Sequence, residues 1–464
     1  MKRPLFYILL FGLFAATSCK KFLETELPKS RVVEEAVFKS DVIATSAIVG
    51  IYHQMRGSGF AGGSFSSTMM LAGLSADELI NYNSNDMAYI EFNTNAITPT
   101  NASNLQLWAS AYETVYATNA ALAGLAAATG LTQPVKSRLQ GEALFLRAFS
   151  YFHLVNFYGD VPLLLTTDYK INQSASRTPA VEVYAQIIKD LLEAQSLLPA
   201  TYPGTEKTRV NKAAATALLA RLYLYTGAWD KAVTQASLVI NDSRYKLEND
   251  PAKVFLASSE EAVWQMPTPN LKGITAEGRT LILTSAPGTA SPAALRPALV
   301  QSFDAADNRL MHWIDSFASG SSKFYYAAKY KNDGLQQVVT PELTTVIRLA
   351  ELYLIRAEAR TRQNQLPPAI ADVDAIRQRA GIPLLSITQP AITKDELLLA
   401  IEQERKHELF LEWGHRWFDL KRTGRAGAVL KSIKSSWGDT DILYPIPEQE
   451  LLLNPNLRPQ NAGY

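Results

Sequence analysis

Two stretches of the sequence combine aromatic rings with amide side chains, a mixture that suits the binding of a sugar or a peptide. Residues 81–104 contain seven asparagines together with Tyr82, Tyr89 and Phe92, and residues 312–330 contain His312, Trp313 and five further aromatic residues. Sugars present apolar C–H faces on which aromatic rings stack, and hydroxyls that pair with Asn, Asp or Arg. The alternative is that these rings only pack the loops down, and for any single residue both interpretations stay open.

We predict that the two stretches form one shallow platform. Stacking is expected from Tyr82, Trp313, Tyr325 or Tyr326, and hydrogen bonds are expected from Asn81, Asn83 or Asn85. The candidate ligand-binding residues are therefore Asn81, Tyr82, Asn83, Asn85, Tyr89, His312, Trp313, Tyr325 and Tyr326.

Residues for catalysis or metal binding are not arranged in any familiar pattern. The five histidines form no HExxH motif or close ligand pair, and one cysteine gives little help to a zinc site. No nucleophile elbow, Walker loop or dinucleotide fingerprint is present. Asp77 and Glu78 could form a hydrolase pair, but adjacent acids do not face each other on a helix. We expect no catalytic residues, no metal and no cofactor.

Residues 402–422, "EQERKHELFLEWGHRWFDLKR", are dense in charged and aromatic side chains. Arg405 and Glu408 are three apart, a favourable pairing on a helix, and Gly414 should break that helix. One interpretation is a binding site built on Trp413, His415 and Trp417. We favour the other, a structural clasp of buried ion pairs and indoles. The residues of this proposed clasp are Arg405, Glu408, Trp413, His415, Arg416 and Trp417.

The elements that must position these residues are mostly helices. Apolar residues recur every three or four positions in residues 104–126 and 180–198, while residues 137–158 are apolar on more than one face and should form a buried, central helix. The stretch 211–240 has the spacing of a tetratricopeptide (TPR) helix pair joined at Gly227, with small residues at Ala220 and Ala232.

The same offsets return in residues 350–381, where Ala357 and Ala369 take the positions of Ala220 and Ala232. Because one TPR pair cannot bury its own face, several should stack into a superhelix. Residues 57–103 and 265–345 break this pattern with Gly, Pro, Asn and aromatic residues, and "EAVWQM" suggests a short strand. The sequence thus predicts a mainly α fold, a TPR-type α-α superhelix with long irregular insertions and a few short β-strands.

The N-terminus has the form of an export signal. Lys2 and Arg3 precede a twelve-residue apolar run and the small residues Ala16–Ser18, and this run is shorter than the roughly 20 residues of a membrane-spanning helix. Cys19, the only cysteine, follows at once, which is where bacterial lipoproteins are lipidated. We therefore expect a signal peptide over residues 1–18, lipidation at Cys19 and a tether over residues 19–40. The alternative is an ordinary signal peptide followed by an incidental free thiol.

Removal of that signal would leave 43 basic and 44 acidic side chains. A near-neutral chain of this kind argues against nucleic acid as a partner.

Several phrases resemble the SusD/RagB family of outer-membrane nutrient-binding lipoproteins. They are "RAFSYFHLVNFYGDVPLL" (147–164), "LRPALVQSFDAADNRL" (295–310), "IRLAELYLIRAEA" (347–359), "DVDAIRQRAG" (372–381), "ERKHELFLEWGHRWFDLKR" (404–422) and "LYPIPEQELLLNPNLRPQNAGY" (443–464). They follow the family's order across nearly the whole chain. The resemblance implies one SusD-like domain over residues 41–464, with the signature phrases serving as fold and interface elements.

The resemblance also implies a role. Family members sit as lids over a SusC-like TonB-dependent barrel in the outer membrane, most binding glycans and some binding peptides. We therefore expect a lipid-anchored, cell-surface protein that is not an enzyme and that delivers an oligosaccharide to such a transporter. A peptide receptor with the same arrangement and a TPR scaffold that only recruits proteins remain alternatives.

Overall fold

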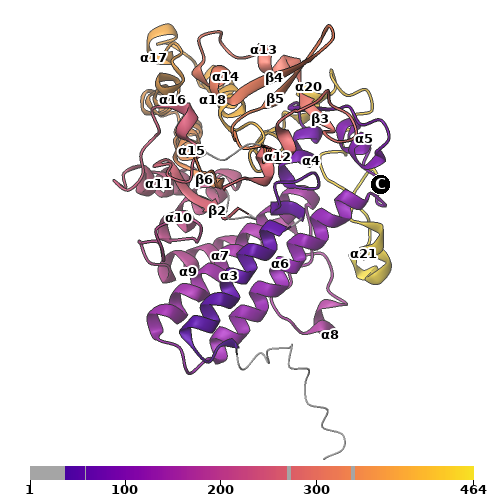
Figure 1. Cartoon of the computed structure of the whole chain (residues 1–464). Coiled ribbons are helices and arrows are strands. Elements are labelled where there is room, and N and C mark those ends of the chain that lie inside the picture. The colour runs from indigo at the N-terminus through magenta and orange to yellow at the C-terminus, as the bar shows by residue number, and fades with distance from the viewer. Residues whose placement is uncertain (1–36, 58, 269–272, 336–339) are drawn as a thin grey trace, which may run out of the picture.

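The computed structural model describes residues 37–464 apart from residues 58, 269–272 and 336–339. Its fold is mainly helical (Figure 1), as the sequence predicts. The helices of the first half are α3 Asp41–Gly57, α4 Thr68–Ser75, α5 Met87–Thr94, α6 Ala102–Ala127, α7 Gln133–Tyr158, α8 Tyr169–Asn172, α9 Ala180–Leu197, α10 Lys212–Tyr225 and α11 Trp229–Ile240. Those of the second half are α12 Ala276–Leu281, α13 Pro297–Gln301, α14 Asn308–Trp313, α15 Leu349–Arg362, α16 Leu366–Ala380, α17 Leu385–Thr388, α18 Lys394–Leu409, α19 His415–Arg422, α20 Ala426–Leu430 and α21 Glu448–Leu453.

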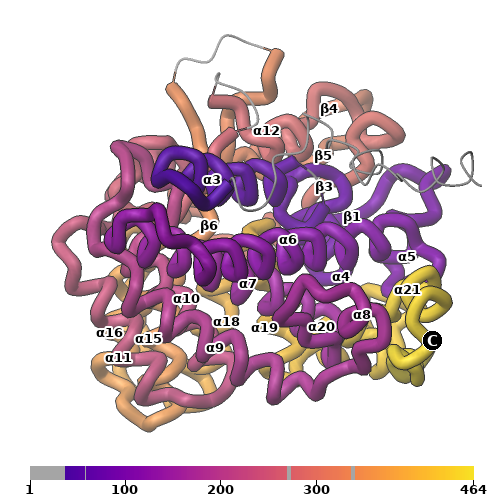
Figure 2. The backbone as a smooth tube through the Cα atoms, turned by 90° about the horizontal axis from the view of Figure 1, so that it is seen from below, coloured from indigo at the N-terminus to yellow at the C-terminus, as the bar shows by residue number. Residues whose placement is uncertain are grey.

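Helix α7 is the central helix. Every residue from Gly141 to Tyr158 is buried, and α7 packs against α3, α6 and α9 (Figure 2). The helix begins at Gln133 with a proline in its first turn and is capped by Gly159. Gly159 has a backbone φ of 72°, which residues other than glycine rarely adopt. The apolar surface on all sides of α7 is thus explained by neighbours on all sides.

The two predicted TPR pairs are present. Helices α10 and α11 pack against each other, α15 and α16 do the same, and α11 packs against α15 to join the pairs. Ala220 and Ala232 are both fully buried at the first pair, as are Ala357 and Ala369 at the second. Helix α10 begins at an Asn211 cap, whose side chain accepts a hydrogen bond from the Ala214 N–H at 3.1 Å.

Two small sheets interrupt the helices. One has the strand order β1-β3-β5-β4, with β1 Leu79–Asn81, β3 Ala293–Leu295, β4 Ile314–Ser319 and β5 Ser322–Ala327. The other pairs β2 Ala262–Met266 with β6 Thr344–Arg348, both antiparallel and fully buried. Strand β2 is the one that "EAVWQM" predicts. The first sheet joins the two insertions, because β1 comes from one and β3, β4 and β5 come from the other.

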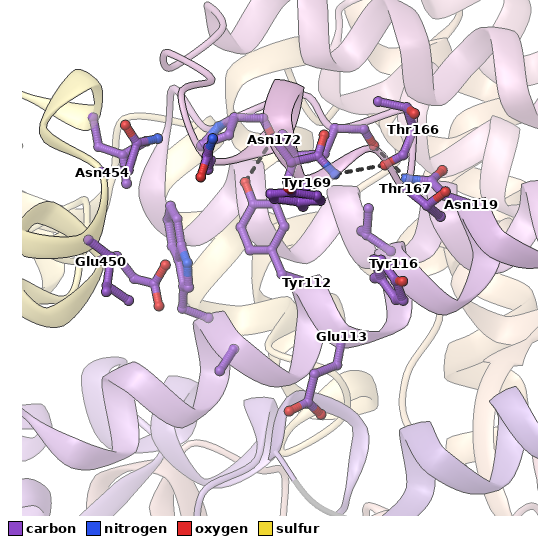
Figure 3. A pocket seen from close by; sticks show the side chains of 18 residues that line it. Tyr112, Glu113, Tyr116, Asn119, Thr166, Thr167, Tyr169, Asn172, Glu450 and Asn454 are labelled. Atoms are coloured by element: carbon purple, nitrogen blue, oxygen red, sulfur yellow. Dashed lines mark hydrogen bonds between the residues drawn. The ribbon is translucent and has the colours of Figure 1, made fainter. Parts of the chain in front are cut away.

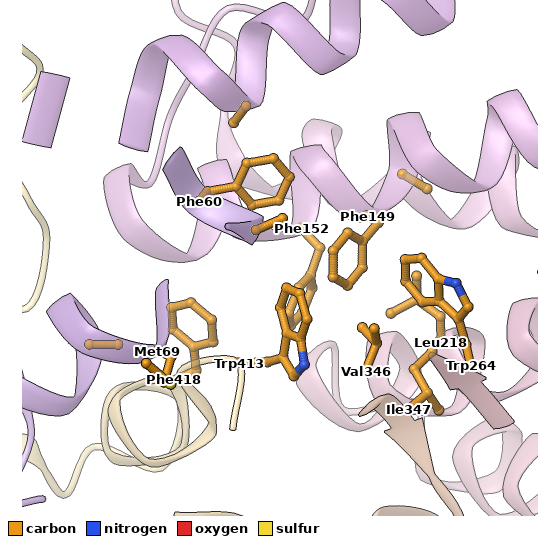
Figure 4. Close-up of a cluster of buried hydrophobic side chains, with 14 of the residues drawn as sticks. Phe60, Met69, Phe149, Phe152, Leu218, Trp264, Val346, Ile347, Trp413 and Phe418 are labelled. Atoms are coloured by element: carbon orange, nitrogen blue, oxygen red, sulfur yellow. The ribbon is translucent and has the colours of Figure 1, made fainter. Parts of the chain in front are cut away.

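The main hydrophobic core lies between α7, the β2–β6 sheet and the loop before α19. Phe149 of α7 contacts Trp264 of β2 and Trp413 edge-on, with ring centroids 5.1 and 5.4 Å apart (Figure 4). Such edge-to-face pairs add to the free energy gained by burying the rings. The core therefore ties the helical scaffold to both sheets.

The folded body begins inside the predicted tether of residues 19–40. Cys19 and residues up to 36 lie outside the described residues, but Phe38 is only 8% exposed and belongs to the main core. Its ring lies against Gly124 of α6, where an added Cβ would come within 2.2 Å of it. Phe38, which lies within the predicted tether of residues 19–40, is thus already part of the folded body.

Candidate functional site

The sheet β1-β3-β5-β4 brings the two predicted ligand-binding stretches together. Strand β1 pairs with β3, and β3 meets β5 where Leu295 lies opposite Tyr325. Tyr82, which follows β1, contacts Phe324 of β5 edge-on with ring centroids 5.4 Å apart. The Tyr82 N–H also donates to the Pro292 carbonyl at 2.7 Å, so the backbone holds this ring at the sheet edge.

Alternation along the strands divides the aromatic residues of the β4–β5 hairpin between two faces. Tyr325 packs against the main core, opposite Ser316. The other face carries the cross-strand pairs Phe317–Phe324 and Asp315–Tyr326. Tyr82 is 39% exposed, while Phe317, Phe324 and Tyr326 are half-buried. We call Tyr82, Phe317, Phe324 and Tyr326 the aromatic platform.

A hydrogen bond orients one ring of this platform. The Tyr326 hydroxyl donates to Asp315 Oδ2 at 3.1 Å. Partial burial, with the Asp315 carboxylate beside it, raises the pKa of Tyr326 to about 12. Tyr326 is therefore neutral at ordinary pH and can still accept a hydrogen bond from a ligand.

The predicted asparagines divide into loop-forming and exposed residues. Asn81 Nδ2 donates to the Asn83 carbonyl and Asn81 Oδ1 accepts from the Asn83 N–H, both at 3.0 Å. Asn83 is 6% exposed, and its Oδ1 accepts from the Asn85 N–H at 3.2 Å. Only Asn85 presents its side chain to solvent. Asn81 and Asn83 therefore shape the loop beside Tyr82 instead of reaching outward.

Two of the predicted aromatic residues are buried. Trp313 is fully buried, and its Nε1–H donates to the Pro251 carbonyl at 2.8 Å beneath the hairpin. Its indole is not accessible to a sugar ring, so the stacking role predicted for Trp313 does not fit the structure. Tyr89 of α5 is 8% exposed and packs into the main core, which leaves little of its ring for a ligand. His312 is half-exposed at the end of α14.

Phe317 and Phe324 were not among the candidates from the sequence. They lie in an alternating stretch, and alternation would have placed Phe324 on the face opposite Tyr325. The alternating pattern thus separates the two faces of β5 in the sequence. Which face points outward depends on the pairing of β5 with β3, a segment about 30 residues away.

Asp77 and Glu78 do not form a catalytic pair. Burial alone would raise the pKa of Asp77, but Arg416, with Nε 2.6 Å from Oδ1, and Lys406, at 2.9 Å, lower it well below its usual range. Glu78 points elsewhere and accepts the Leu411 N–H at 3.1 Å. Burial and the neighbouring Asp77 raise the pKa of Glu78 to about 8. Next to the start of β1, Glu78 thus holds the loop before α19, and Asp77 holds α18 and α19.

The clasp residues of 402–422 are all buried, but their pairing differs from the prediction. Arg405 does not pair with Glu408. It pairs with Asp419 of α19 at 2.6 Å, while Glu408 faces Arg309 of α14, Arg348 of β6 and Arg379 of α16. Helix geometry allows a pair between Arg405 and Glu408, which are three residues apart. Charged side chains from other elements nevertheless lie closer to each of them. The ion pairs therefore link α18 to four other elements instead of stabilising α18 alone.

The aromatic members of the clasp are core residues. Trp413 Nε1–H donates to the Thr345 carbonyl at 2.9 Å, and Trp417 is fully buried and stacks with Tyr444. Burial, with Arg221 nearby, lowers the pKa of His415 well below its ordinary value. His415 Nε2 lies 4.0 Å from Glu351 Oε2, but a neutral imidazole makes this a polar contact and not an ion pair. These positions support the structural interpretation of the segment.

A cavity lies in another part of the molecule, far from the aromatic platform (Figure 1). This cavity of about 640 Å³ opens between α6, the segment 162–173 and α21, with Tyr112, Tyr116 and Tyr169 around it and Glu450 facing them from α21 (Figure 3). The periodic residues Trp108, Tyr112 and Asn119 of α6 line this cavity, but their spacing predicts only a helical face, and α21, which completes the cavity, lies far away in the sequence.

Two kinds of functional feature, a metal-binding cluster and a membrane-spanning helix, are absent from the described residues. Within residues 37–464, their gaps excepted, no group of three His, Cys, Asp or Glu side chains could hold a metal ion. In the same part of the chain, none of the helices combines the length and apolar character needed to span a membrane.

The fold is a helical-repeat scaffold that carries two small sheets. A family model described as "Starch-binding associating with outer membrane" matches residues 21–224, and the model of the SusD family matches residues 301–464. The chain belongs to the SusD/RagB family, which associates with the outer membrane and whose members are binding proteins and not enzymes.

Relatives and solved structures agree with this assignment. SusD-like protein P2 of Formosa agariphila is 29% identical, over 95% of this chain and 96% of that protein. The crystal structure of a SusD superfamily protein from Bacteroides vulgatus is 22% identical with a TM-score of 0.80, covering 92% of this chain and 100% of the other. A laminarin-binding SusD-like protein is 25% identical with a TM-score of 0.77, again over 92% and 100%.

Proposed function

We propose that this protein is a cell-surface receptor that binds an oligosaccharide on the aromatic platform. The observation that carries the proposal is the four-stranded sheet, which joins both insertions and leaves Tyr82, Phe317, Phe324 and Tyr326 on its outward face. Pyranose rings stack on such surfaces through their C–H faces. Asn85, one of the predicted hydrogen-bonding residues, is exposed, and the candidate residue His312 is half-exposed, so both can reach a ligand.

The shape of the platform favours a glycan over a peptide. A shallow aromatic surface suits a chain of sugar rings, whereas a peptide receptor would need a deeper, closed cavity that buries side chains. The family model named for starch and the structural neighbour named for laminarin support the same class of ligand. Stacking of one or two rings supplies only a few kcal/mol, so a dissociation constant of about micromolar to millimolar is expected.

Native electrophoresis through gels containing soluble starch or laminarin tests the ligand class. Retardation by at least one of these polysaccharides, compared with a gel without polysaccharide, is the expected result. Unchanged mobility in both gels, together with saturable binding of a peptide mixture, would replace the glycan receptor with the peptide receptor.

The second part of the proposal concerns anchoring and delivery. Cys19, once lipidated, would hold the protein at the outer membrane, where it would act as a lid over a SusC-like TonB-dependent transporter. Gentle purification from detergent-solubilised outer membranes should recover a large TonB-dependent barrel with the protein. Purification of Cys19→Ala alongside it gives the control, since that variant should be lost from the membrane fraction. Recovery of the native protein without any barrel would contradict the lid arrangement.

A further inference from the structure

The cavity of about 640 Å³ between α6, α8 and α21 is a candidate site of its own. It lies well away from the β4–β5 hairpin, and both views of the molecule separate the two (Figures 1 and 2). Its volume is within the range of about 300–1,000 Å³ that small-molecule sites occupy.

Exposed aromatic rings line this cavity. Tyr116 of α6 is 57% exposed and Tyr169 of α8 is 68% exposed. Behind them Trp108 and Tyr112 lie with ring centroids 4.9 Å apart, and the Tyr112 hydroxyl donates to the Pro162 carbonyl at 2.8 Å. A fixed inner wall thus faces two accessible rings, which is the arrangement that holds a flat apolar surface between them.

Two polar side chains, Asn172 and Glu450, also line this cavity. Asn172 Nδ2 donates to the Thr166 carbonyl at 2.8 Å, while Asn172 Oδ1 is buried with no hydrogen-bond partner among the described residues. Buried polar atoms are normally paired, so Asn172 Oδ1 leaves hydrogen-bonding capacity unused in the wall of the cavity. Glu450 faces the cavity from α21, where burial raises the pKa of its carboxyl and a hydrogen bond from Trp108 opposes that rise.

The charges around the cavity limit what it can hold. Its described lining residues include the acids Glu113 and Glu450 and no lysine or arginine. A sulfated or uronic-acid chain would bring anions next to carboxylates without a basic partner. Sugar hydroxyls, by contrast, can donate to the carboxylate of Glu450 without bringing a like charge.

We infer that this cavity is a second carbohydrate site, which takes a short stretch of a neutral glycan, roughly two or three rings by volume. The inference rests on the proposed function for its ligand class but on different residues for its site. Two sites on one rigid chain would hold a long polysaccharide at two points, so that a polymer binds more tightly than a hexasaccharide of the same linkage.

Calorimetric titration with maltohexaose and laminarihexaose, each used as a separate probe, tests the inference in the full chain. The starting protein is the platform variant Tyr82→Ala with Phe324→Ala, so that residual binding reports the cavity. We expect this variant to retain binding of one equivalent of at least one hexaose. Addition of Tyr116→Ala and Tyr169→Ala should then weaken that residual binding at least tenfold. Ile171→Ala is the matched control, because Ile171 is 59% exposed on the same helix α8 but does not line the cavity.

The outcomes separate the second site from the proposed function. If the wild type binds a hexaose and the platform variant binds none, the platform receptor stands and the second site is refuted. If Tyr116→Ala with Tyr169→Ala leaves residual binding unchanged, or Ile171→Ala weakens it equally, the cavity is not the site. Equal binding of a sulfated hexaose by the platform variant would refute the neutral specificity. If the wild type binds neither hexaose, the inference and the proposed glycan class fail together.

Discussion

At the scale of single residues, the faces of β5 decide which aromatic side chains can meet a ligand. Tyr325 points into the core, whereas its neighbours Phe324 and Tyr326 point outward. Trp313 lies one residue before β4 and is buried under the hairpin, where Lys329 Nζ sits 4.9 Å from its ring centroid. Aromatic composition alone could identify the stretch, but not which of its rings are accessible.

The contrast between Tyr82 and Trp313 gives a first prediction. Tyr82→Ala should weaken binding of a confirmed glycan by about tenfold, since a lost stacking ring costs about 1 kcal/mol or slightly more, with little change in the free energy of unfolding. Tyr82→Phe, which keeps the ring, should retain the affinity. Trp313→Ala should instead lower the free energy of unfolding by about 3–5 kcal/mol. Calorimetry and urea denaturation measure the two effects, and the reverse pattern would restore Trp313 as the contact residue.

Glu78 gives a pH-dependent prediction. Its pKa is about 8 in the folded state against 4.5 as the ordinary value, so between these pH values the folded protein holds a proton that the unfolded chain has released. Raising the pH therefore favours unfolding by about 1.4 kcal/mol per pH unit across this window. Glu78→Gln, which imitates the protonated acid, should lack this loss and gain stability relative to the wild type from pH 5 to pH 8. Denaturation curves at several pH values test this, and a constant difference between the two proteins would contradict it.

At the scale of elements, the buried ion pairs connect helices and strands that lie far apart in the sequence. Arg348 of β6 bonds to Glu261 at 2.8 Å and to Glu412 at 2.8 Å, and Arg309 of α14 bonds to Glu408 of α18 at 3.0 Å. Each of these arginines is at most 2% exposed at its side chain. The signature phrases of the family therefore supply the contacts between elements of the scaffold.

Removal of one member of this network should be costly. Arg348→Met leaves buried carboxylates without their partner, and should lower the free energy of unfolding by about 3–5 kcal/mol. Lys431→Met breaks the exposed pair with Asp439 and should change it by less than about 1 kcal/mol. Chemical denaturation compares them, and similar small effects for both would show that the network does not stabilise the fold.

The helices could be predicted well from the sequence, because their signals are local. The periodic stretches 104–126, 137–158 and 180–198 correspond to α6, α7 and α9, and both TPR pairs follow from small residues at fixed spacing. The sheet β1-β3-β5-β4 could not be predicted, because its strands are three to six residues long and β1 pairs with β3 across more than 200 residues. The sequence predicted that the two stretches form one platform, but not which of their rings are accessible.

The close approach of α10 and α11 gives an element-scale prediction. Ala232 is fully buried between the helices, so Ala232→Leu should overpack the pair and lower the free energy of unfolding by about 1–3 kcal/mol. Leu238→Ala on the same helix, where Leu238 is 57% exposed, should change it by less than about 0.5 kcal/mol. Thermal unfolding distinguishes them, and an unaffected midpoint for Ala232→Leu would mean that the helices can separate without cost.

At the scale of the whole molecule, the helical scaffold holds the aromatic platform in one place. The core joins α7 to the β2–β6 sheet and to the loop before α19, while Glu78 attaches that loop, and Asp77 attaches α19, to the start of β1. The platform is thus formed by loops and short strands that the scaffold positions, which allows it to bind without a large rearrangement.

The most direct test of this account is a crystal structure of the protein with a neutral glycan that retards it in native gels. The account predicts electron density for a sugar ring against Tyr82 and Phe324, with a hydroxyl within hydrogen-bond distance of Asn85, His312 or Tyr326. A bound glycan that leaves these rings uncovered, at full occupancy elsewhere, would contradict the claim that the joined insertions form the receptor site.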